Sequence, residues 1–280
     1  MTYVDLHLHT HYSDGSDSPA EVIRRARELG IAAAAITDHD TVSGVEEARQ
    51  AAVGAGLGFL AGTEISAHFE SSEVHVVGLG IDPDCPALLG TLEQLQKDRN
   101  TRAEKILARL QERGIKIEWA MAVEYAGGGV VARMHIARAL RSLGITRSTQ
   151  EGFDRFLNSG RPGYVPKATL PVAQAVDTIH AAGGLAFVGH PGLGKTTRRL
   201  LPRLLVLPFD GVEAYHSSHS PGRIAEFVEF AQAHHLLITG GSDCHGLSKG
   251  RRDMGSVRTP VEYYERIVEA LSRRNAAPTP

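Results

Sequence analysis

Short apolar runs alternate with amphipathic segments along most of the chain. The apolar runs have the length and composition of β-strands, and between most of them apolar residues recur at helical spacing. The predicted strands are Tyr3–His9, Ala32–Thr37, Gly58–Thr63, Val74–Ile81, Leu185–Val188, Gly211–Tyr215 and Leu236–Gly240. The predicted helices outside the central part are Pro19–Leu29, Ser43–Ala55, Pro171–Ala182, Pro221–His235 and Val261–Arg274. Strands that alternate with helices predict an α/β fold with a parallel sheet or barrel.

The alternation stops between about Pro86 and Pro166, where only helical patterns remain. A long helix is predicted from Pro86 to Arg113, and shorter ones near Arg133–Leu143 and Thr149–Asn158. We therefore expect residues 86–166 to form a small helical domain. It would be inserted into a barrel built from residues 1–85 and 167–280.

Charge is unevenly spread along the 280 residues, although the formal net charge is only −2. From Lys97 to Lys167 the sequence holds 14 lysines and arginines against 7 acidic residues. This basic stretch could face a polyanionic substrate, or it could be an ordinary solvated helix surface. No apolar run has the roughly 20 residues of a membrane span, and the N-terminus has no leader pattern. We therefore expect a cytoplasmic protein that does not bind membranes.

Histidines and carboxylates gather where predicted strands end. His7 and His9 alternate along the first strand and therefore project from the same face. In a βα barrel the C-terminal strand ends build the active site. The candidates placed there are His7, His9, His39, Glu64, His75, His190, Asp243 and His245. His75 opens its apolar run rather than closing it, which leaves His68 as its competitor. Imidazole and carboxylate groups without thiolate suit Mn, Zn or Fe, so we predict one shared metal site.

These motifs resemble those of the polymerase-and-histidinol-phosphatase (PHP) family. The matching pattern is Asp5-x-His7-x-His9-Thr10-x-x-Ser13-Asp14-Gly15, Thr37-Asp38-His39-Asp40, Gly62-x-Glu64, His190-Pro191 and Ser242-Asp243-x-His245. The resemblance implies a distorted seven-stranded βα barrel, two or three divalent metal ions and hydrolysis of phosphate esters. A hydroxide that bridges two metals is then the expected nucleophile at phosphorus.

The resemblance also divides the ligands into three sets. One metal would take His7, His9, Glu64 and Asp243; a second would share Glu64 and add His75 and His190; a third would take Asp14, His39 and His245. Asp38 and Asp40 would orient these ligands.

Within the family the chain is most similar to a branch that includes a 3′,5′-nucleoside bisphosphate phosphatase and a 5′-to-3′ exoribonuclease acting on short RNA. The likeness rests on Ser13-Asp14-Gly15, on the stretch from Val74 to Asp82, and on Arg133-x-His135 through Leu140. It implies that Arg133, His135 and His219 hold the substrate phosphate and stabilise its charge, a task that suits the guanidinium fork. We expect a nucleotide or short RNA as substrate, no DNA duplex and no obligate protein partner.

The sequence also allows three other interpretations. The stretch Gly189–Thr196 fits the phosphate-binding loop pattern G-x-x-x-x-G-K-[ST]. A nucleotide triphosphatase is disfavoured because the metal site already explains His190, but Lys195 stays a candidate for contact with a substrate phosphate. A histidinol phosphatase would use the same chemistry on a smaller substrate. A non-catalytic metal-binding interaction module is the alternative from another functional class.

Overall fold

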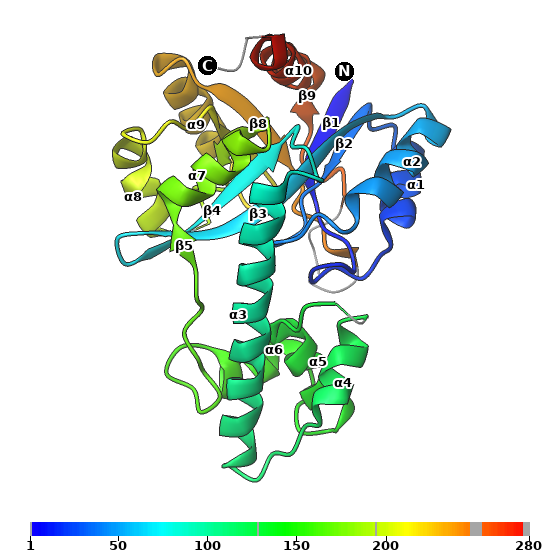
Figure 1. Ribbon diagram of the computed structural model, residues 1–280, viewed down its shortest axis with the longest axis vertical. Coiled ribbons are helices and arrows are strands. Elements are labelled where there is room, and N and C mark those ends of the chain that lie inside the picture. Colours follow the sequence, from blue (N-terminus) through cyan, green and yellow to red (C-terminus); the bar gives the residue numbers. More distant parts are fainter. Residues whose placement is uncertain (1, 128, 194, 247–253, 277–280) are drawn as a thin grey trace.

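The fold is a curved, nearly closed sheet with helices packed against its strands and a helical extension at one end (Figure 1). The computed structural model describes residues 2–127, 129–193, 195–246 and 254–276, although not the side chains of residues 195–197 and 275. Within this part the strands form one nine-stranded sheet. Their order is β8 (Leu237–Gly241), β7 (Gly211–His216), β6 (Leu185–Val188), β4 (Ser72–Leu79), β3 (Gly58–Phe69), β2 (Ala33–Ile36), β1 (Tyr3–Leu8) and β9 (Thr259–Pro260), with β5 (Leu170–Pro171) paired to β3. The predicted α/β barrel is confirmed.

Among the strands that the sequence predicts, β4 departs from the parallel pattern; the unpredicted strand β9 also pairs antiparallel, with β1. Strand β4 pairs antiparallel with both of its neighbours, β3 and β6. Strand β3 also runs past the predicted end at Thr63 as far as Phe69, and it turns directly into β4. The sequence missed this hairpin because the polar residues from Glu64 to His68 interrupt the apolar run. The start of β4 therefore lies at the edge of the sheet where the parallel strands end.

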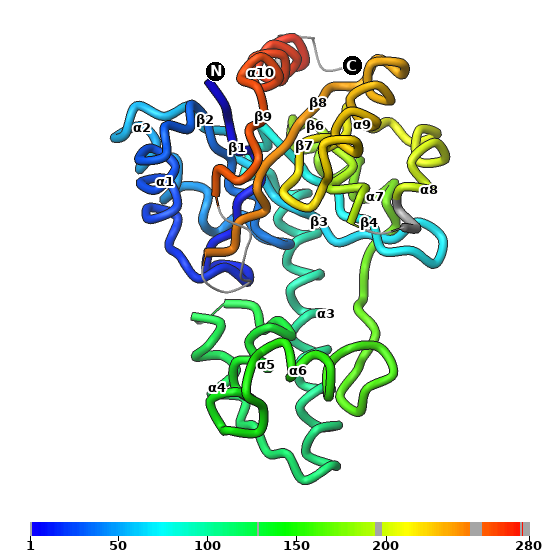
Figure 2. Tube along the Cα trace, turned by 180° about the vertical axis from the view of Figure 1, so that it is seen from behind, coloured from blue at the N-terminus to red at the C-terminus, as the bar shows by residue number. Residues whose placement is uncertain are grey.

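The barrel closes between β1 and the segment that follows β8. The His9 amide donates to the Cys244 carbonyl at 3.0 Å, and the Asp243 amide donates to the His7 carbonyl at 2.9 Å. A Cβ atom at Gly241 would collide with the backbone of His7, so a glycine is needed for this close approach. Figure 2 shows β1 and β8 side by side on the rear face. Residues near the two ends of the chain are thereby joined into one site.

Six helices pack against the strands, within the described residues. They are α1 (Pro19–Glu28), α2 (Val45–Ala55), α7 (Val172–Ala181), α8 (Lys195–Leu204), α9 (Pro221–Ala233) and α10 (Val261–Ala276). The start of α1 is fixed by a capping box, in which Ser18 and Glu21 satisfy each other's backbone amides. Among the helices described, none combines the length and apolar character needed to cross a membrane.

The central segment is helical and has a hydrophobic cluster of its own. It comprises α3 (Pro86–Gln111), α4 (Trp119–Tyr125), α5 (Arg133–Ser142), α6 (Thr149–Gly152) and a π-helical turn, η1 (Phe153–Leu157). The first half of α3 packs into the barrel core through Leu88 and Leu92, whereas the second half packs among the other helices through Ile106 and Leu110. Helix α3 therefore connects the two regions as a single rod (Figures 1 and 2).

Candidate metal centre and substrate cavity

The carboxylate of Glu64 lies at the centre of a histidine cluster. It is buried on β3, where its backbone bridges to that of His39. The imidazole nitrogens within 3.3 Å of its two oxygens belong to His7, His9, His39, His75 and His190. The shortest contacts join Oε1 to His75 Nδ1 at 2.6 Å and to His190 Nε2 at 2.8 Å. One carboxylate thus contacts five imidazoles from four separate strand ends or loops, since His7 and His9 both belong to the end of β1.

The remaining predicted ligands extend the cluster beside β1. Asp243 Oδ1 lies 3.1 Å from His9 Nε2, and Asp14 Oδ1 lies 3.0 Å from His245 Nε2. The rings of His9 and His245 are stacked with their centroids 4.0 Å apart. The structure therefore brings all nine predicted ligands together. Their donor atoms form four overlapping groups, each within 4.8 Å: His9, Asp14, His39 and His245; His7, Glu64 and His190; His7, His9 and Asp243; and His39, Glu64 and His75.

The antiparallel course of β4 decides between His75 and His68. Because β4 begins at the edge where the parallel strands end, His75 reaches Glu64 from the first half of its strand. His68 lies beyond the site near the end of β3, where its Nδ1 is 3.1 Å from the Thr169 carbonyl. In this geometry His75 contacts Glu64 and His68 does not, which favours His75 as the candidate ligand.

The buried lone pairs of this cluster match what a metal ion requires. In the described chain, Oε2 of Glu64 and Nδ1 of His39 make no hydrogen bond, although the two atoms are only 2.9 Å apart. Burial opposes the charge of Glu64, but the imidazoles of His39, His75 and His7 hold its pKa well below the usual range. Burial likewise holds the pKa of His39 well below its usual value. Ionised carboxylates and neutral imidazoles are the forms that bind metals.

Glu213 on β7 is a residue that the sequence analysis missed. Its Oε1 is 2.8 Å from His7 Nδ1, and its Oε2 accepts the amide hydrogen of His190 at 2.6 Å. Burial raises the pKa of Glu213, but the imidazole of His7 outweighs it and lowers the pKa to about 2. A carboxylate on the far nitrogen of a histidine ligand fixes the ring and its tautomer. The position of this acidic residue inside the apolar run of β7 was a sequence signal that could have identified Glu213.

His216, at the end of the same strand, was missed as well. Its ring is buried, and its Nε2 lies 3.3 Å from Asp243 Oδ2. Burial holds the pKa of His216 well below its usual value. Its position at the C-terminal end of a parallel strand was the signal that could have identified it.

Asp38 and Asp40 fix loops that carry ligands. Asp38 accepts hydrogen bonds from the amide and hydroxyl of Thr10 and from the Ser13 hydroxyl, at 2.5 to 2.7 Å. This holds the loop that leads to Asp14. Asp40 accepts from the Ser66 amide at 2.7 Å and pairs with Arg99 at 2.5 Å.

The backbone is strained at three positions of the site. Asp40, His190 and Asp243 have positive φ angles of 53°, 23° and 55°. L-residues adopt such angles at a cost of about 1–3 kcal/mol each, and they concentrate where function requires a particular geometry. Each of the three follows a strand and turns the chain at the edge that holds the ligands.

His135 and His219, which the family resemblance assigns to the substrate phosphate, contact backbone groups in the structure, and their contact with phosphate stays a prediction. His135 is only 1% exposed, and its Nδ1 accepts the Ala132 amide hydrogen at the start of α5. Both ring nitrogens of His219 are engaged: Nδ1 lies 2.8 Å from the Ala214 carbonyl, and Nε2 accepts the Gly192 amide hydrogen at 3.0 Å. His135 therefore caps a helix, and His219 holds the loop that carries His190. Sequence cannot distinguish these tasks from ligand binding, because the partners are backbone groups.

A cavity of about 300 Å³ opens directly onto the metal-binding cluster. Asp14, His39 and His75 line it on the barrel side. Cationic side chains also line it, namely Arg99, Arg102, Arg133 and Lys167. Arg133, the predicted phosphate ligand, is one of these four; Arg99, Arg102 and Lys167 belong to the basic stretch from Lys97 to Lys167, and the sequence predicted no individual role for them. The side chain of Lys195 lies outside the described residues.

The cations of this cavity are crowded together. Burial and repulsion from Arg133 and Arg99 lower the pKa of Arg102 to about 10. Burial and Arg99 also lower the pKa of Lys167, whose ammonium pairs with Glu73 at 2.6 Å. Arg133 is held by an aromatic ring and a carbonyl rather than a carboxylate: it lies over Phe153 and donates to Leu157 at 3.4 Å. Partly buried cations that repel one another favour a bound anion.

Comparison with known proteins finds relatives over most of the chain. The PHP domain family matches residues 5–161. A 3′,5′-nucleoside bisphosphate phosphatase of Chromobacterium violaceum is 38% identical over 261 residues, which is 91% of each chain. The 5′-3′ exoribonuclease Rnm of Escherichia coli is 38% identical over 248 residues, covering 86% of this chain and 84% of the relative. The solved structure of a predicted metal-dependent phosphoesterase from Bifidobacterium adolescentis superposes with a TM-score of 0.87 at 28% identity, covering 95% of this chain and 96% of the other.

Proposed function

Because this chain belongs to the PHP domain family, we propose that it is a metal-dependent phosphoesterase acting on nucleotides. The proposed substrates are the 3′-phosphate of nucleoside 3′,5′-bisphosphates and short RNA with a 5′-phosphate. The observation that carries the proposal is the small cavity, which places cationic side chains beside a cluster of metal-binding groups. A nucleotide substrate also fits the cytoplasmic location expected from the sequence.

The nine clustered ligands would hold two or three divalent ions. Histidine and carboxylate donors without thiolate suit Mn, Zn or Fe. When bound, such ions supply an activated water and neutralise charge on the phosphoryl oxygens. Glu64 contacts five of the histidines and is the residue we assign to shared coordination.

The residues of the cavity supply binding and orientation. Arg133 and Arg102 are proposed to hold phosphate oxygens, a role suited to the planar guanidinium group. Glu213 and His219 are positioning residues, since they contact His7, His190 or the loop between Gly189 and Gly192.

No protein nucleophile is required: Cys244 packs in an apolar cluster, and burial raises the pKa of its thiol. Water is therefore the proposed nucleophile at phosphorus.

One chemical step serves both substrates. In the bisphosphate, hydrolysis breaks the bond between phosphorus and O3′ and releases inorganic phosphate. In RNA, breaking the same bond releases a 5′-mononucleotide and leaves the phosphate on the shortened chain. Water provides the new oxygen on phosphorus, and the O3′ leaving group takes up a proton. The two substrates thus differ only in the group bound to phosphorus opposite O3′. In the bisphosphate this group is a phosphate oxygen, and in RNA it is the O5′ of the next nucleotide.

Neither alternative interpretation of the sequence is favoured. The two curated relatives described above are named as enzymes, a nucleoside bisphosphate phosphatase and an exoribonuclease, and neither name refers to histidinol phosphate. The loop between Gly189 and Gly192 directs His190 to Glu64, which accounts for it without nucleotide triphosphate binding.

The direct test is product release by protein loaded separately with Mn, Zn or Fe. The substrates are 3′-phosphoadenosine 5′-phosphate, a 5′-phosphorylated RNA pentanucleotide and histidinol phosphate. We expect AMP from the first, successive mononucleotides from the second, and little turnover of the third. Turnover of histidinol phosphate alone would overturn the substrate assignment. No turnover of any of the three would overturn the activity itself.

A further inference from the structure

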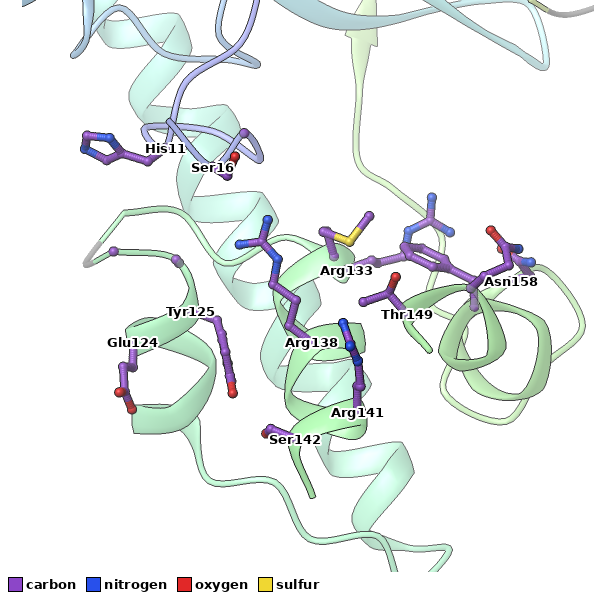
Figure 3. Close-up of a pocket in the computed structure, with 16 residues that line it drawn as sticks. His11, Ser16, Glu124, Tyr125, Arg133, Arg138, Arg141, Ser142, Thr149 and Asn158 are labelled. Atoms are coloured by element: carbon purple, nitrogen blue, oxygen red, sulfur yellow. The ribbon is translucent and has the colours of Figure 1, made fainter. Parts of the chain in front are cut away.

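A second cavity, of about 1300 Å³, lies next to the first, between the barrel edge and the helical segment (Figure 3). The two cavities are neighbours, because Arg133, Met134 and Phe153 line both of them. Gly15 and Ser16, which directly follow the candidate ligand Asp14, line the larger one on the barrel side. We call this larger cavity the arginine groove. It leads away from the metal-binding cluster.

Three arginines of α5 give the groove its charge. Arg133, Arg138 and Arg141 all line it, and in Figure 3 the Arg138 side chain points toward the loop that carries Ser16. Eight residues separate the first from the last, which is about 12 Å along a helix at roughly 1.5 Å per residue. Glu124 is the acidic side chain on the opposite wall. Within the described residues, no carboxylate forms an ion pair with any of the three arginines.

Aromatic rings lie among these cations. Tyr125 on α4 and Phe153 in η1 line the groove, and both rings remain partly exposed. Tyr125 stands on the wall opposite α5 in Figure 3. A positively charged groove with interspersed aromatic rings is how proteins bind single-stranded nucleic acid without regard to sequence, because every base has a face that can stack.

The size of the groove argues against a mononucleotide as its sole occupant. Small-molecule sites occupy roughly 300–1,000 Å³. The small cavity of about 300 Å³ falls in that range, whereas the arginine groove exceeds it. A nucleoside bisphosphate ends at the phosphate that is attacked. Only RNA carries further nucleotides beyond that phosphorus, and these need a path away from the metal site.

We propose that the arginine groove holds the RNA chain downstream of the scissile phosphate, with Arg138 and Arg141 on its backbone and Tyr125 beneath a base. This inference rests on the proposed function and adds a determinant of substrate choice to it. The small cavity serves both substrates, and the groove serves only RNA. Arg138 and Arg141 therefore set the preference for an oligonucleotide over a bisphosphate.

The test compares two substrates in the double variant Arg138→Ala/Arg141→Ala. For a 5′-phosphorylated RNA pentanucleotide we expect KM to rise at least about tenfold with little change in kcat. For 3′-phosphoadenosine 5′-phosphate we expect KM to stay within about twofold. The slope of log affinity against log salt for the RNA should shrink by about 0.7 for each lost phosphate contact. Arg113→Ala, an exposed arginine at the end of α3, is the matched control and should change neither KM.

Two further measurements separate this inference from the activity itself. Polarisation of a fluorescent 5′-phosphorylated pentanucleotide reports binding to metal-free protein, without turnover. The conservative variant Arg138→Lys/Arg141→Lys should recover most of the RNA affinity. If the Ala variant lost affinity equally for both substrates, these arginines would contact the first nucleotide. If its RNA affinity were unchanged, the downstream RNA would not lie in the groove. Either result overturns the inference while bisphosphate turnover still supports the proposed function.

Discussion

The metal-binding cluster on the barrel and the arginine groove on the helical segment hold their charged groups in different ways. In the cluster, Glu64 is fully buried and meets imidazoles from several strand ends, each at a fixed distance. In the groove, Arg138 is half-buried, Arg141 is exposed, and both project from one helix. A metal ion needs lone pairs that converge on one point, whereas a flexible polyanion needs charge spread along a path.

The two regions also tolerate change differently. A ligand cluster assembled from β1, β3, β4 and several loops depends on the whole barrel, so the loss of one ligand weakens the others. The guanidinium groups on α5 act more independently. This contrast predicts that variants of the barrel lose metal and activity together, whereas variants of the helical segment lose substrate affinity with metal retained.

Glu64→Gln is the strongest challenge to this contrast. Removing the central negative charge should lower metal occupancy and reduce turnover by at least about 1,000-fold. Metal content by elemental analysis and kcat, measured on the same sample, check this prediction. Full metal occupancy in this variant would show that Glu64 is not a shared ligand.

Arg99→Met tests the ion pair that joins the two regions. Arg99 on α3 pairs with the buried Asp40 beside the metal site. Burial disfavours the carboxylate, but Arg99 holds the pKa of Asp40 below its usual value, so removing this cation should leave an uncompensated buried charge. We expect a loss of about 3–5 kcal/mol in the free energy of unfolding by urea.

Two companion variants make this stability measurement specific. Adding Asp40→Asn to Arg99→Met should recover part of the loss. Lys97→Met on the exposed face of the same helix should change stability by less than about 1 kcal/mol. If Arg99→Met and Lys97→Met behaved alike, the buried pair would have no special importance.

Arg133→Ala tests the cavity where the two regions meet. We expect the variant to keep its metal and to lose about 2–4 kcal/mol of transition-state binding, as measured by kcat/KM on both proposed substrates. Arg133→Lys should restore only part of this, because an ammonium group lacks the planar fork. Loss of metal from Arg133→Ala would contradict its assignment to substrate.

His219→Ala should have the smallest effect and distinguishes positioning from phosphate binding. If His219 only holds the loop that carries His190, the variant should bind metal about 10-fold more weakly, with KM unchanged once metal is saturating. His234→Ala, an exposed histidine at the end of α9, is the control. A higher KM with normal metal affinity would restore the role that the sequence predicted.

The sequence by itself determined the barrel, the helical segment and the family. Successive side chains of a strand point to opposite faces, so His7 and His9 project from the same face at the end of β1. This holds wherever the strand lies in the sheet. Strand-end motifs such as Thr37-Asp38-His39 predict a shared edge, because parallel strands end on the same side. The basic stretch from Lys97 to Lys167 was compatible with a polyanionic substrate and equally with an ordinary solvated helix surface.

Only the tertiary structure decided which polar residues meet. The antiparallel β4 brings His75 rather than His68 to Glu64, and its direction depends on a hairpin that the residue pattern does not mark. Glu213 contacts His7 across 206 positions of the sequence. The Nε2 atom of His219 accepts a hydrogen bond from Gly192 in a distant loop, while its Nδ1 contacts the nearby Ala214 carbonyl. Local patterns determine local conformation, but contacts between distant segments depend on strand order, register and the path of the loops.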